Sequence, residues 1–113
     1  KLKIVLAHIG YPRVDETLYV ARKHKHVYCD ISWPYGDVNH PSFLYMLWKD
    51  LLTALNLGVM NKMLFVTDYP GVWQRPYVDM LMNIYRYAPQ DDLKLPMDKV
   101  AVIMVKNIQP LLP

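Results

Sequence analysis

The stretch "MLFVTDYPGVW" (residues 63–73) ends a short apolar run at an acid, Asp68, and then turns the chain with a Pro-Gly pair. A run of this kind is typical of a strand covered on both faces, as in parallel sheets. A carboxylate at the tip of such a strand is expected to have lost much of its water and to need a partner. Two other runs, residues 2–8 ("LKIVLAH") and 27–32 ("VYCDIS"), share this strand-like character.

Helical patterns lie between and after these three runs. Residues 15–23 have acids at the front and bases at the rear, which suits the helix dipole. The strongest pattern begins at Pro41 and ends near Gly58, a fitting C-terminal stop. Its apolar face is expected to consist of Leu44, Leu47, Trp48, Leu51, Leu52 and Leu55. A helix beginning at Pro76 and another over residues 97–107 complete the order β-α-β-α-β-α-α.

This order predicts an α/β fold of parallel strands joined by right-handed crossover helices. The chain has 113 residues, of which 53% are hydrophobic and 20% charged, so it should fold as one small domain. Its 13 basic and 10 acidic residues are not clustered by sign, so no nucleic-acid partner is expected. Charges interrupt every apolar run well before about 18 residues, so no membrane span is expected.

Cys29 is the only cysteine, which excludes a disulfide within the chain and favours a reducing compartment. We therefore expect a cytoplasmic protein. The position of Cys29 in the middle of a strand predicts a small core residue rather than a reactive thiol.

Polar residues follow each strand at the end where parallel β/α folds bind ligands. The first strand ends at His8 and the third at Asp68, and both side chains are standard ligands for Zn²⁺ and similar ions. A bound metal lowers the pKa of its water from about 15.7 to near 7, and a histidine at this rim can also act as acid or base. Two ligands are too few for a metal site. Asp30 is expected to bond neighbouring strand ends, and Ser32 and Thr67 to serve as turn and backbone partners.

Four residues on the same rim are weaker candidates for contact with a small-molecule substrate. Trp33 and Trp73 are expected to shape a pocket, and the planar fork of Arg75 suits a substrate carboxylate. His40 is also a candidate for substrate contact, but it precedes a helix start, so a purely structural role at that helix start is the alternative. The His-x-His spacing at residues 24–26 is expected to be a solvated turn, because it lies before the second strand, at the opposite edge of the sheet from Asp68.

Four segments in order resemble motifs of the amidohydrolase-related family of metal-dependent TIM barrels. "LKIVLAHIGYP" resembles the sixth-strand motif, "HVYCDIS" the seventh, "MLFVTDYP" the eighth and "MVKNIQPLL" the closing helix. The resemblance implies that Asp68 binds the metal and helps to activate water or substrate. It also implies that His8 binds metal or acts as an acid or base on the substrate. Two departures are Val66, where the family has glycine before Thr-Asp, and Tyr11, where a second glycine often follows His-x-Gly.

The resemblance further implies that residues 1–113 form a partial domain, the C-terminal portion of a (β/α)8 TIM barrel. The family's His-x-His on strand one and its fifth-strand histidine have no counterpart, and a complete barrel needs about 250 residues. The incomplete barrel leaves two sheet edges open, so a missing N-terminal barrel segment or another copy is the expected partner. The isolated chain is expected to be inactive.

Three functions remain open at this point. The first is a metal-dependent hydrolase that attacks a small carbonyl or carboxylate substrate with metal-activated water, with zinc as the first choice of ion. The second is a decarboxylase or hydratase of the same fold. The third is a small metal-free α/β module for binding or assembly.

Overall fold

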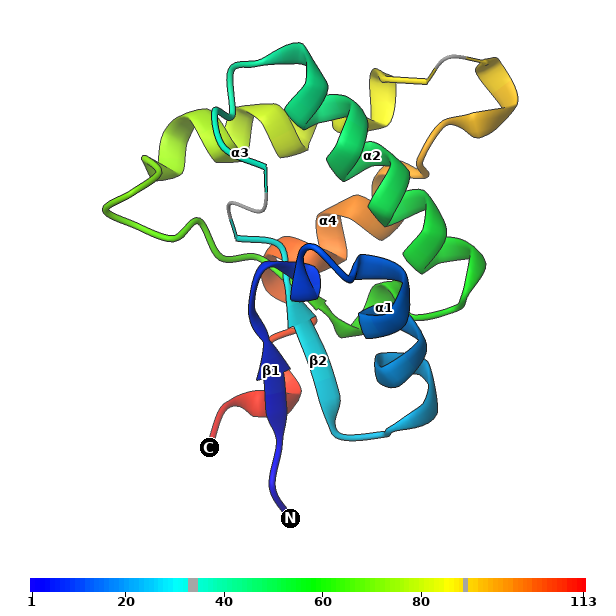
Figure 1. The fold of residues 1–113 in the computed structure, drawn as a ribbon, viewed down its shortest axis with the longest axis vertical. Coiled ribbons are helices and arrows are strands. Elements are labelled where there is room, and N and C mark those ends of the chain that lie inside the picture. The colour runs from blue at the N-terminus through cyan, green and yellow to red at the C-terminus, as the bar shows by residue number, and fades with distance from the viewer. Residues whose placement is uncertain (33–34, 89) are drawn as a thin grey trace.

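Three parallel strands form the centre of the protein (Figure 1), here described from a computed structural model that covers residues 1–32, 35–88 and 90–113. They are β1 (Ile4–Leu6), β2 (Val27–Asp30) and β3 (Met63–Leu64), in the spatial order β1-β2-β3. Ile4 pairs with Val27, and Cys29 pairs with Met63. The predicted α/β class and parallel pairing are therefore confirmed.

The four predicted helices are present in the predicted order. They are α1 (Val14–Lys23), α2 (Pro41–Asn56), α3 (Gln74–Asn83) and α4 (Met97–Val105). Short 3₁₀ turns join them, namely η1 (Ala7–Gly10), η2 (Met60–Lys62), η3 (Ile84–Arg86), η4 (Asp91–Leu93) and η5 (Gln109–Leu111). None of the helices in the described residues is long and apolar enough to cross a membrane.

All three strands are shorter than predicted. β3 ends at Leu64, four residues before Asp68, although the apolar run continues between them. The last backbone bond to β2 runs from Ile31 N to Leu64 O, and the next amide, Phe65 N, donates to Ile103 O of α4. The strand therefore ends where its backbone changes partner from the sheet to a helix.

The buried face of α2 is displaced from the predicted one. Leu47, Trp48 and Leu51 are buried as expected, but Leu44, Leu52 and Leu55 are only half-buried. Phe43, Asp50 and Ala54 are buried in their place. The helix packs with its face rotated because it fills the space between the sheet, α1 and α3, which the spacing of leucines alone does not reveal.

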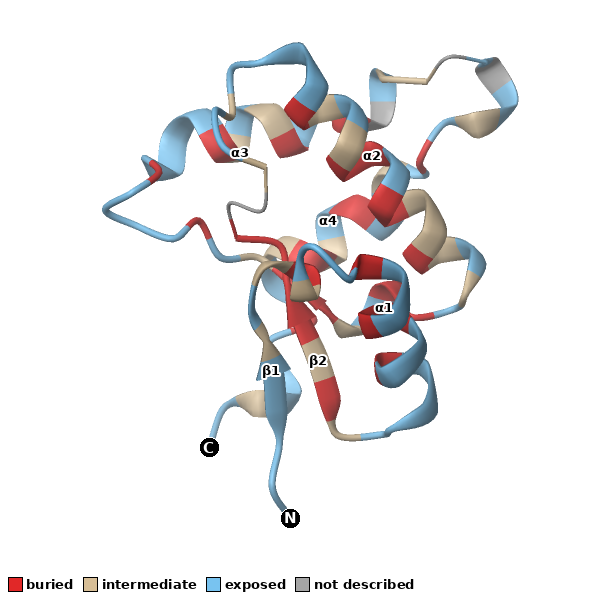
Figure 2. Cartoon of the chain, in the orientation of Figure 1, coloured by how far each residue is buried: buried red, intermediate tan, exposed pale blue. Residues whose placement is uncertain are grey.

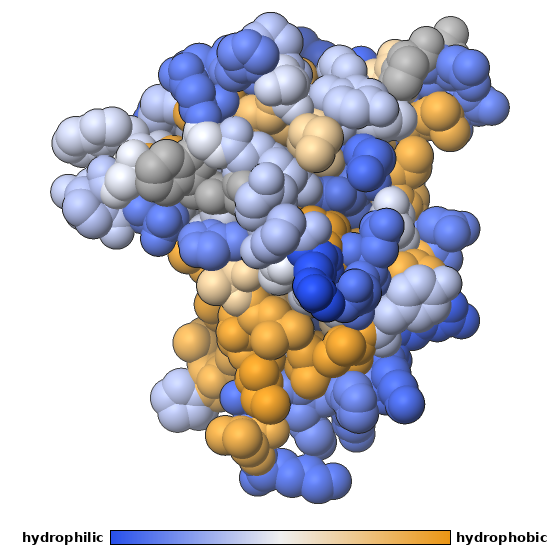
Figure 3. All heavy atoms as spheres, in the orientation of Figure 1, coloured by the Kyte–Doolittle hydropathy of each residue, from blue (hydrophilic) through white to orange (hydrophobic). Residues whose placement is uncertain are grey.

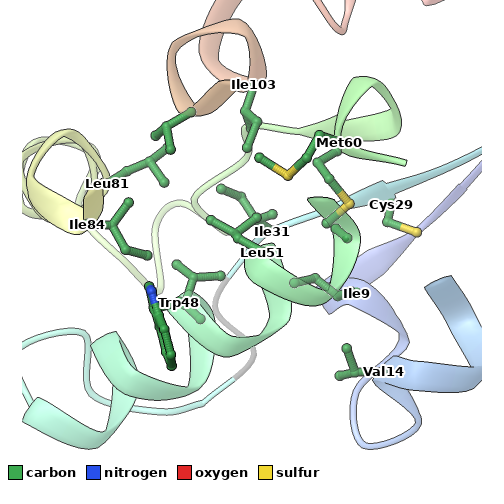
Figure 4. Packing of buried hydrophobic residues seen from close by; sticks show 14 of the residues in the cluster. Ile9, Val14, Cys29, Ile31, Trp48, Leu51, Met60, Leu81, Ile84 and Ile103 are labelled. Carbon is green, nitrogen blue, oxygen red and sulfur yellow. The ribbon is translucent and has the colours of Figure 1, made fainter. Parts of the chain in front are cut away.

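The core lies between the sheet and the helices (Figure 2), where α2, α3 and α4 direct side chains toward the carboxyl half of the sheet (Figure 4). Trp48, Leu81, Ile84 and Ile103 are each at most 4% exposed. Cys29 is fully buried, and burial raises the pKa of its thiol to about 11. The predicted role of Cys29 as a core residue is confirmed.

The two edges of the sheet differ. On the β3 side, the amide of the buried Asn107 donates to Met60 O and Met63 O at 2.7 and 2.8 Å, so the end of α4 is bound to this edge. On the other side, Ile4 and Val5 of β1 are 43% and 44% exposed. Figure 3 shows hydrophobic atoms gathered around β1, so this apolar edge strand is partly open to solvent and has no further strand beside it among the described residues.

The turn after β1 depends on Gly10. His8, Ile9 and Gly10 all have left-handed backbone conformations, with φ of 56°, 51° and 69°. A Cβ atom on Gly10 would lie 1.9 Å from Oγ1 of Thr17 in α1. Glycine is therefore required for the close packing of this turn on α1.

Replacing Gly10 by alanine should destabilise the protein by more than the usual cost of a left-handed alanine, about 1–2 kcal/mol, because the new methyl group meets Thr17. Gly58→Ala is the matched control, since Gly58 has a φ of 72° but a Cβ atom there would have no neighbour within 4 Å. Chemical denaturation measures both free energies of unfolding. Equal losses in the two variants would contradict the packing role.

Asp50 is a carboxylate within the core, only 2% exposed, and it accepts a hydrogen bond from the hydroxyl of Tyr35. Burial raises the pKa of Asp50 from 3.8 to about 6, and the Tyr35 bond only partly opposes this shift. The native state therefore binds more protons than the unfolded chain between these two pH values.

The stability contributed by neutral Asp50 should be fully present below pH 3.8 and lost as the pH rises through about 6, by at most about 3 kcal/mol. Asp50→Asn should remove this part of the pH dependence of the unfolding free energy. Asp79→Asn, which changes an exposed acid on α3, should leave it in place. The same slope in wild type and Asp50→Asn would refute the assignment.

Candidate functional site

His8 and Asp68 both follow the carboxyl ends of their strands, so they lie toward the same end of the parallel sheet, the carboxyl end. β2 lies between β1 and β3, and neighbouring strands are about 4.8 Å apart, so the two strand ends are separated by about 10 Å. The topology thus brings the two main candidates to one edge, as predicted.

The carboxylate of Asp30 joins the ends of β1 and β2. Its Oδ1 accepts hydrogen bonds from the backbone amides of His8 and Ser32, both at 3.0 Å, and from the Ser32 hydroxyl. Asp30 is 8% exposed, so these donors replace most of the water that the charge has lost. The predicted bonding of Asp30 to a neighbouring strand end is confirmed.

The imidazole of His8 is held by Ser32. Its Nδ1 lies 2.9 Å from both the carbonyl oxygen and the hydroxyl of Ser32. A carbonyl oxygen only accepts, so Nδ1 carries the hydrogen, and neutral His8 has its lone pair on Nε2. Nε2 has no hydrogen-bond partner among the described residues, and it is the atom available to a ligand or proton.

The contact from Ser32 to the ring of His8 was not predicted from the sequence. Ser32 was expected only to bond the turn and backbone, whereas it is 3% exposed and connects the Asp30 carboxylate to the imidazole. The signal was present in the spacing Asp-x-Ser at the end of a strand, because residues two apart on a strand lie on the same face.

Asp68 is exposed, which corrects the expectation that its carboxylate is desolvated at the tip of a buried strand. The reason is that β3 ends at Leu64 and the chain has left the sheet before it reaches Asp68. The backbone of Asp68 is left-handed, with a φ of 66°, and its carbonyl oxygen accepts from Gly71 N and Val72 N. Its carboxylate has no hydrogen bond or ion pair within the described part of the chain.

Two of the weaker candidates bond within their own helices. Nδ1 of His40 accepts from Ser42 N at 3.2 Å, so His40 caps the start of α2. Nε of Arg75 lies 2.9 Å from both carboxylate oxygens of Asp79, one turn further along α3. The structure thus gives both residues local partners, and Trp33 lies outside the described residues.

Trp73 lies where the loops after β2 and β3 approach each other. It is 69% exposed, and its ring meets that of Tyr69 edge-on at 5.7 Å. A cavity of about 270 Å³ lies between the two loops and is lined by Gly36, Asp37, Val38, Asn39, Gly71, Val72, Trp73 and Pro76. Trp73 thus lines a small hollow, and its contact with a substrate stays a prediction.

The structure offers no complete metal site within residues 1–32, 35–88 and 90–113, where no group of three or more His, Cys, Asp or Glu side chains could hold an ion. His24 and His26 lie before β2, at the opposite edge of the sheet from Asp68, as predicted. The donor chemistry of His8 and Asp68 fits a divalent metal, but further ligands would have to come from elsewhere.

Comparison with known proteins assigns the chain to a family. The family model described as amidohydrolase matches residues 1–113, the whole chain. None of the curated proteins and none of the solved structures compared with the chain matches it.

Proposed function

The chain belongs to the amidohydrolase family, and from this premise we propose that it supplies strands six to eight, with His8 and Asp68, to the active site of a metal-dependent hydrolase. The observation that carries the proposal is that both residues follow the carboxyl ends of parallel strands, His8 with an available Nε2 and Asp68 with a carboxylate that has no bond among the described residues. The substrate is proposed to be a small carbonyl or carboxylate compound.

Backbone strain at both residues supports this site. His8 and Asp68 have φ values of 56° and 66°, and the left-handed region costs residues other than glycine about 1–3 kcal/mol. Strain of this kind persists only where surrounding contacts impose it, and it is concentrated at functional sites. At His8 the contacts are visible, since Asp30 holds the backbone amide and Ser32 holds the ring.

His8 and Asp68 would hold a divalent metal, and zinc suits one nitrogen and one oxygen donor. Such an ion would supply hydroxide at neutral pH. Ser32 keeps the hydrogen of His8 on Nδ1, which directs the lone pair of Nε2 outward as a ligand or proton acceptor. Asp68 is the second proton carrier of the site, and its exposure leaves it accessible to water and substrate.

The open edge of β1 supports the proposal that more strands complete the sheet. Alternate residues of a parallel strand direct their amide and carbonyl to opposite sides. Ile4 N donates to His26 O beside β2, so the backbone groups of Val5 point away from the sheet. In the proposed (β/α)8 barrel, a further parallel strand pairs there and brings the remaining ligands to the same rim.

Asp68→Asn in the full-length enzyme should lower kcat/KM by about 10²–10⁴-fold, because the amide neither carries the proton nor ligates the metal as well. The protein should remain folded, since the Asp68 carboxylate makes no internal bond in the described chain. Asp79→Asn is the control, because it changes an exposed acid that pairs with Arg75 on the surface of α3. Near wild-type rates in Asp68→Asn would refute the assigned role.

The assay should follow both hydrolysis of lactones or amides and release of carbon dioxide from aromatic acids. If carbon dioxide is released, the hydrolase proposal is rejected in favour of the decarboxylase alternative. Metal analysis of the same sample addresses the third alternative, because a natively folded protein without metal would favour a binding or assembly module.

Residues 1–113 alone should associate with another copy, because β1 exposes apolar side chains and unpaired backbone groups. Val5→Lys should reduce this association by placing a charge on the open edge. Tyr19→Lys serves as the control, since Tyr19 is 59% exposed but lies on α1. Light scattering measures the result, and a dilute monodisperse wild-type monomer would contradict the prediction.

A further inference from the structure

Asp50, in the middle of α2, is a buried hydrogen-bond partner of Tyr35. The Tyr35 hydroxyl donates to Oδ2 of Asp50, which is 2% exposed. Tyr35 follows β2, so this bond connects the segment after β2 to the interior of the following helix. A hydrogen bond to a buried carboxylate is strong, because no water competes for it.

The ring of Tyr35 lies between two other rings. It meets Tyr11 edge-on at 5.2 Å, and Phe43 edge-on at 5.9 Å. Phe43 in turn meets Tyr77 of α3 at 6.0 Å, and both are fully buried. Each edge-to-face pair contributes about 0.5–1.5 kcal/mol beyond the area that it buries.

Both ends of this series are connected to the candidate site. Tyr11 is three residues after His8 in the turn that follows β1. The Tyr77 hydroxyl donates to Ile31 O, next to Ser32, which holds the imidazole of His8. We call Tyr11, Tyr35, Phe43 and Tyr77 the aromatic chain. It contacts the chain segments on both sides of the Asp30–Ser32–His8 hydrogen bonds.

We infer that Asp50 is a positioning residue, which through Tyr35 and the aromatic chain holds the turn carrying His8 in register with the end of β2. The effect on catalysis rests on the proposed function, whereas the coupling of the two loops does not. Asp50 contacts neither His8 nor Asp68 in the structure, so it acts only through Tyr35.

The charge of Asp50 gives this connection a pH dependence. The Tyr35 hydroxyl bonds more strongly to the carboxylate than to the neutral acid, and the pKa of Asp50 is raised to about 6 by burial. The connection is therefore strongest above pH 6 and weakens as the pH falls through that value. The titratable or charged groups around Asp50 are Tyr35, Tyr11, Arg13, Asp15, Glu16 and Lys49.

The test is an NMR titration of the tyrosine ring resonances in the full-length protein. In the wild type, the Tyr11 and Tyr35 rings should shift together with a midpoint near pH 6. Asp50→Asn and Tyr35→Phe should each abolish the step at Tyr11. Tyr19→Phe is the control, because it removes an exposed hydroxyl of α1 and should leave the step unchanged.

Histidine side chains in unstructured peptides titrate in the same pH region, so the variant His8→Gln is included. The inference requires that the step at Tyr11 persists in His8→Gln. Absence of the step from the wild type, or its survival in Tyr35→Phe, overturns the inference. If a variant fails to fold, the wild-type titration still tests the inference, because absence of the step there overturns it.

The kinetic arm uses Tyr35→Phe, which keeps the ring and removes only the bond to Asp50. A positioning role should lower kcat by about 10-fold with little change in KM, since a misplaced group weakens transition-state contacts. If kcat is unchanged in Tyr35→Phe while the wild-type Tyr11 and Tyr35 rings titrate together, only the inferred effect on catalysis is overturned. Near wild-type kcat/KM in Asp68→Asn would refute the proposed function, but it would not affect the inferred coupling between the two loops.

Discussion

The hydrogen bonds to Asp30 join the ends of β1 and β2 at the candidate site. One carboxylate oxygen accepts from the amide of His8, the amide of Ser32 and the hydroxyl of Ser32. Without these donors the charge would lie almost buried at the end of β2 and its burial would cost several kcal/mol. The bond from the His8 amide anchors the turn after β1, and Ser32, which Asp30 holds, in turn holds the His8 ring at Nδ1.

The sheet is firmly packed on one side and open on the other. On the side of β3, α4 contributes Ile103 O and the Asn107 amide to groups of the strand and the turn before it. β1 has only β2 as a partner among the described strands, and its Ile4 and Val5 remain partly exposed. Two open sheet edges were expected, but α4 occupies the β3 side and only the β1 side stays without a further strand among the described residues.

Sequence reasoning was most reliable for α1, α2 and α4, because dipole-matched charges, Pro41 and runs of apolar residues are local signals. It was least reliable at strand ends. The apolar run from Met63 continues to Thr67, yet β3 ends at Leu64, because the backbone beyond it bonds to α4. For the same reason Asp68 was expected to be desolvated and is exposed. Similarly, leucine spacing on α2 did not reveal that Phe43 and Asp50 face the core.

What the sequence by itself determined is the order of strands and helices, the edge of the sheet where His8 and Asp68 lie, and the family. The order and the edge follow from local periodicity and from the rule that parallel strands share one carboxyl end, whereas the family follows from the resemblance of four motifs in order. Only the tertiary structure decided that Ser32 orients the imidazole and that Asp50 binds Tyr35. Each of these depends on which side chains reach one another across space, and the burial and competition among polar partners that select them exist only in the folded chain.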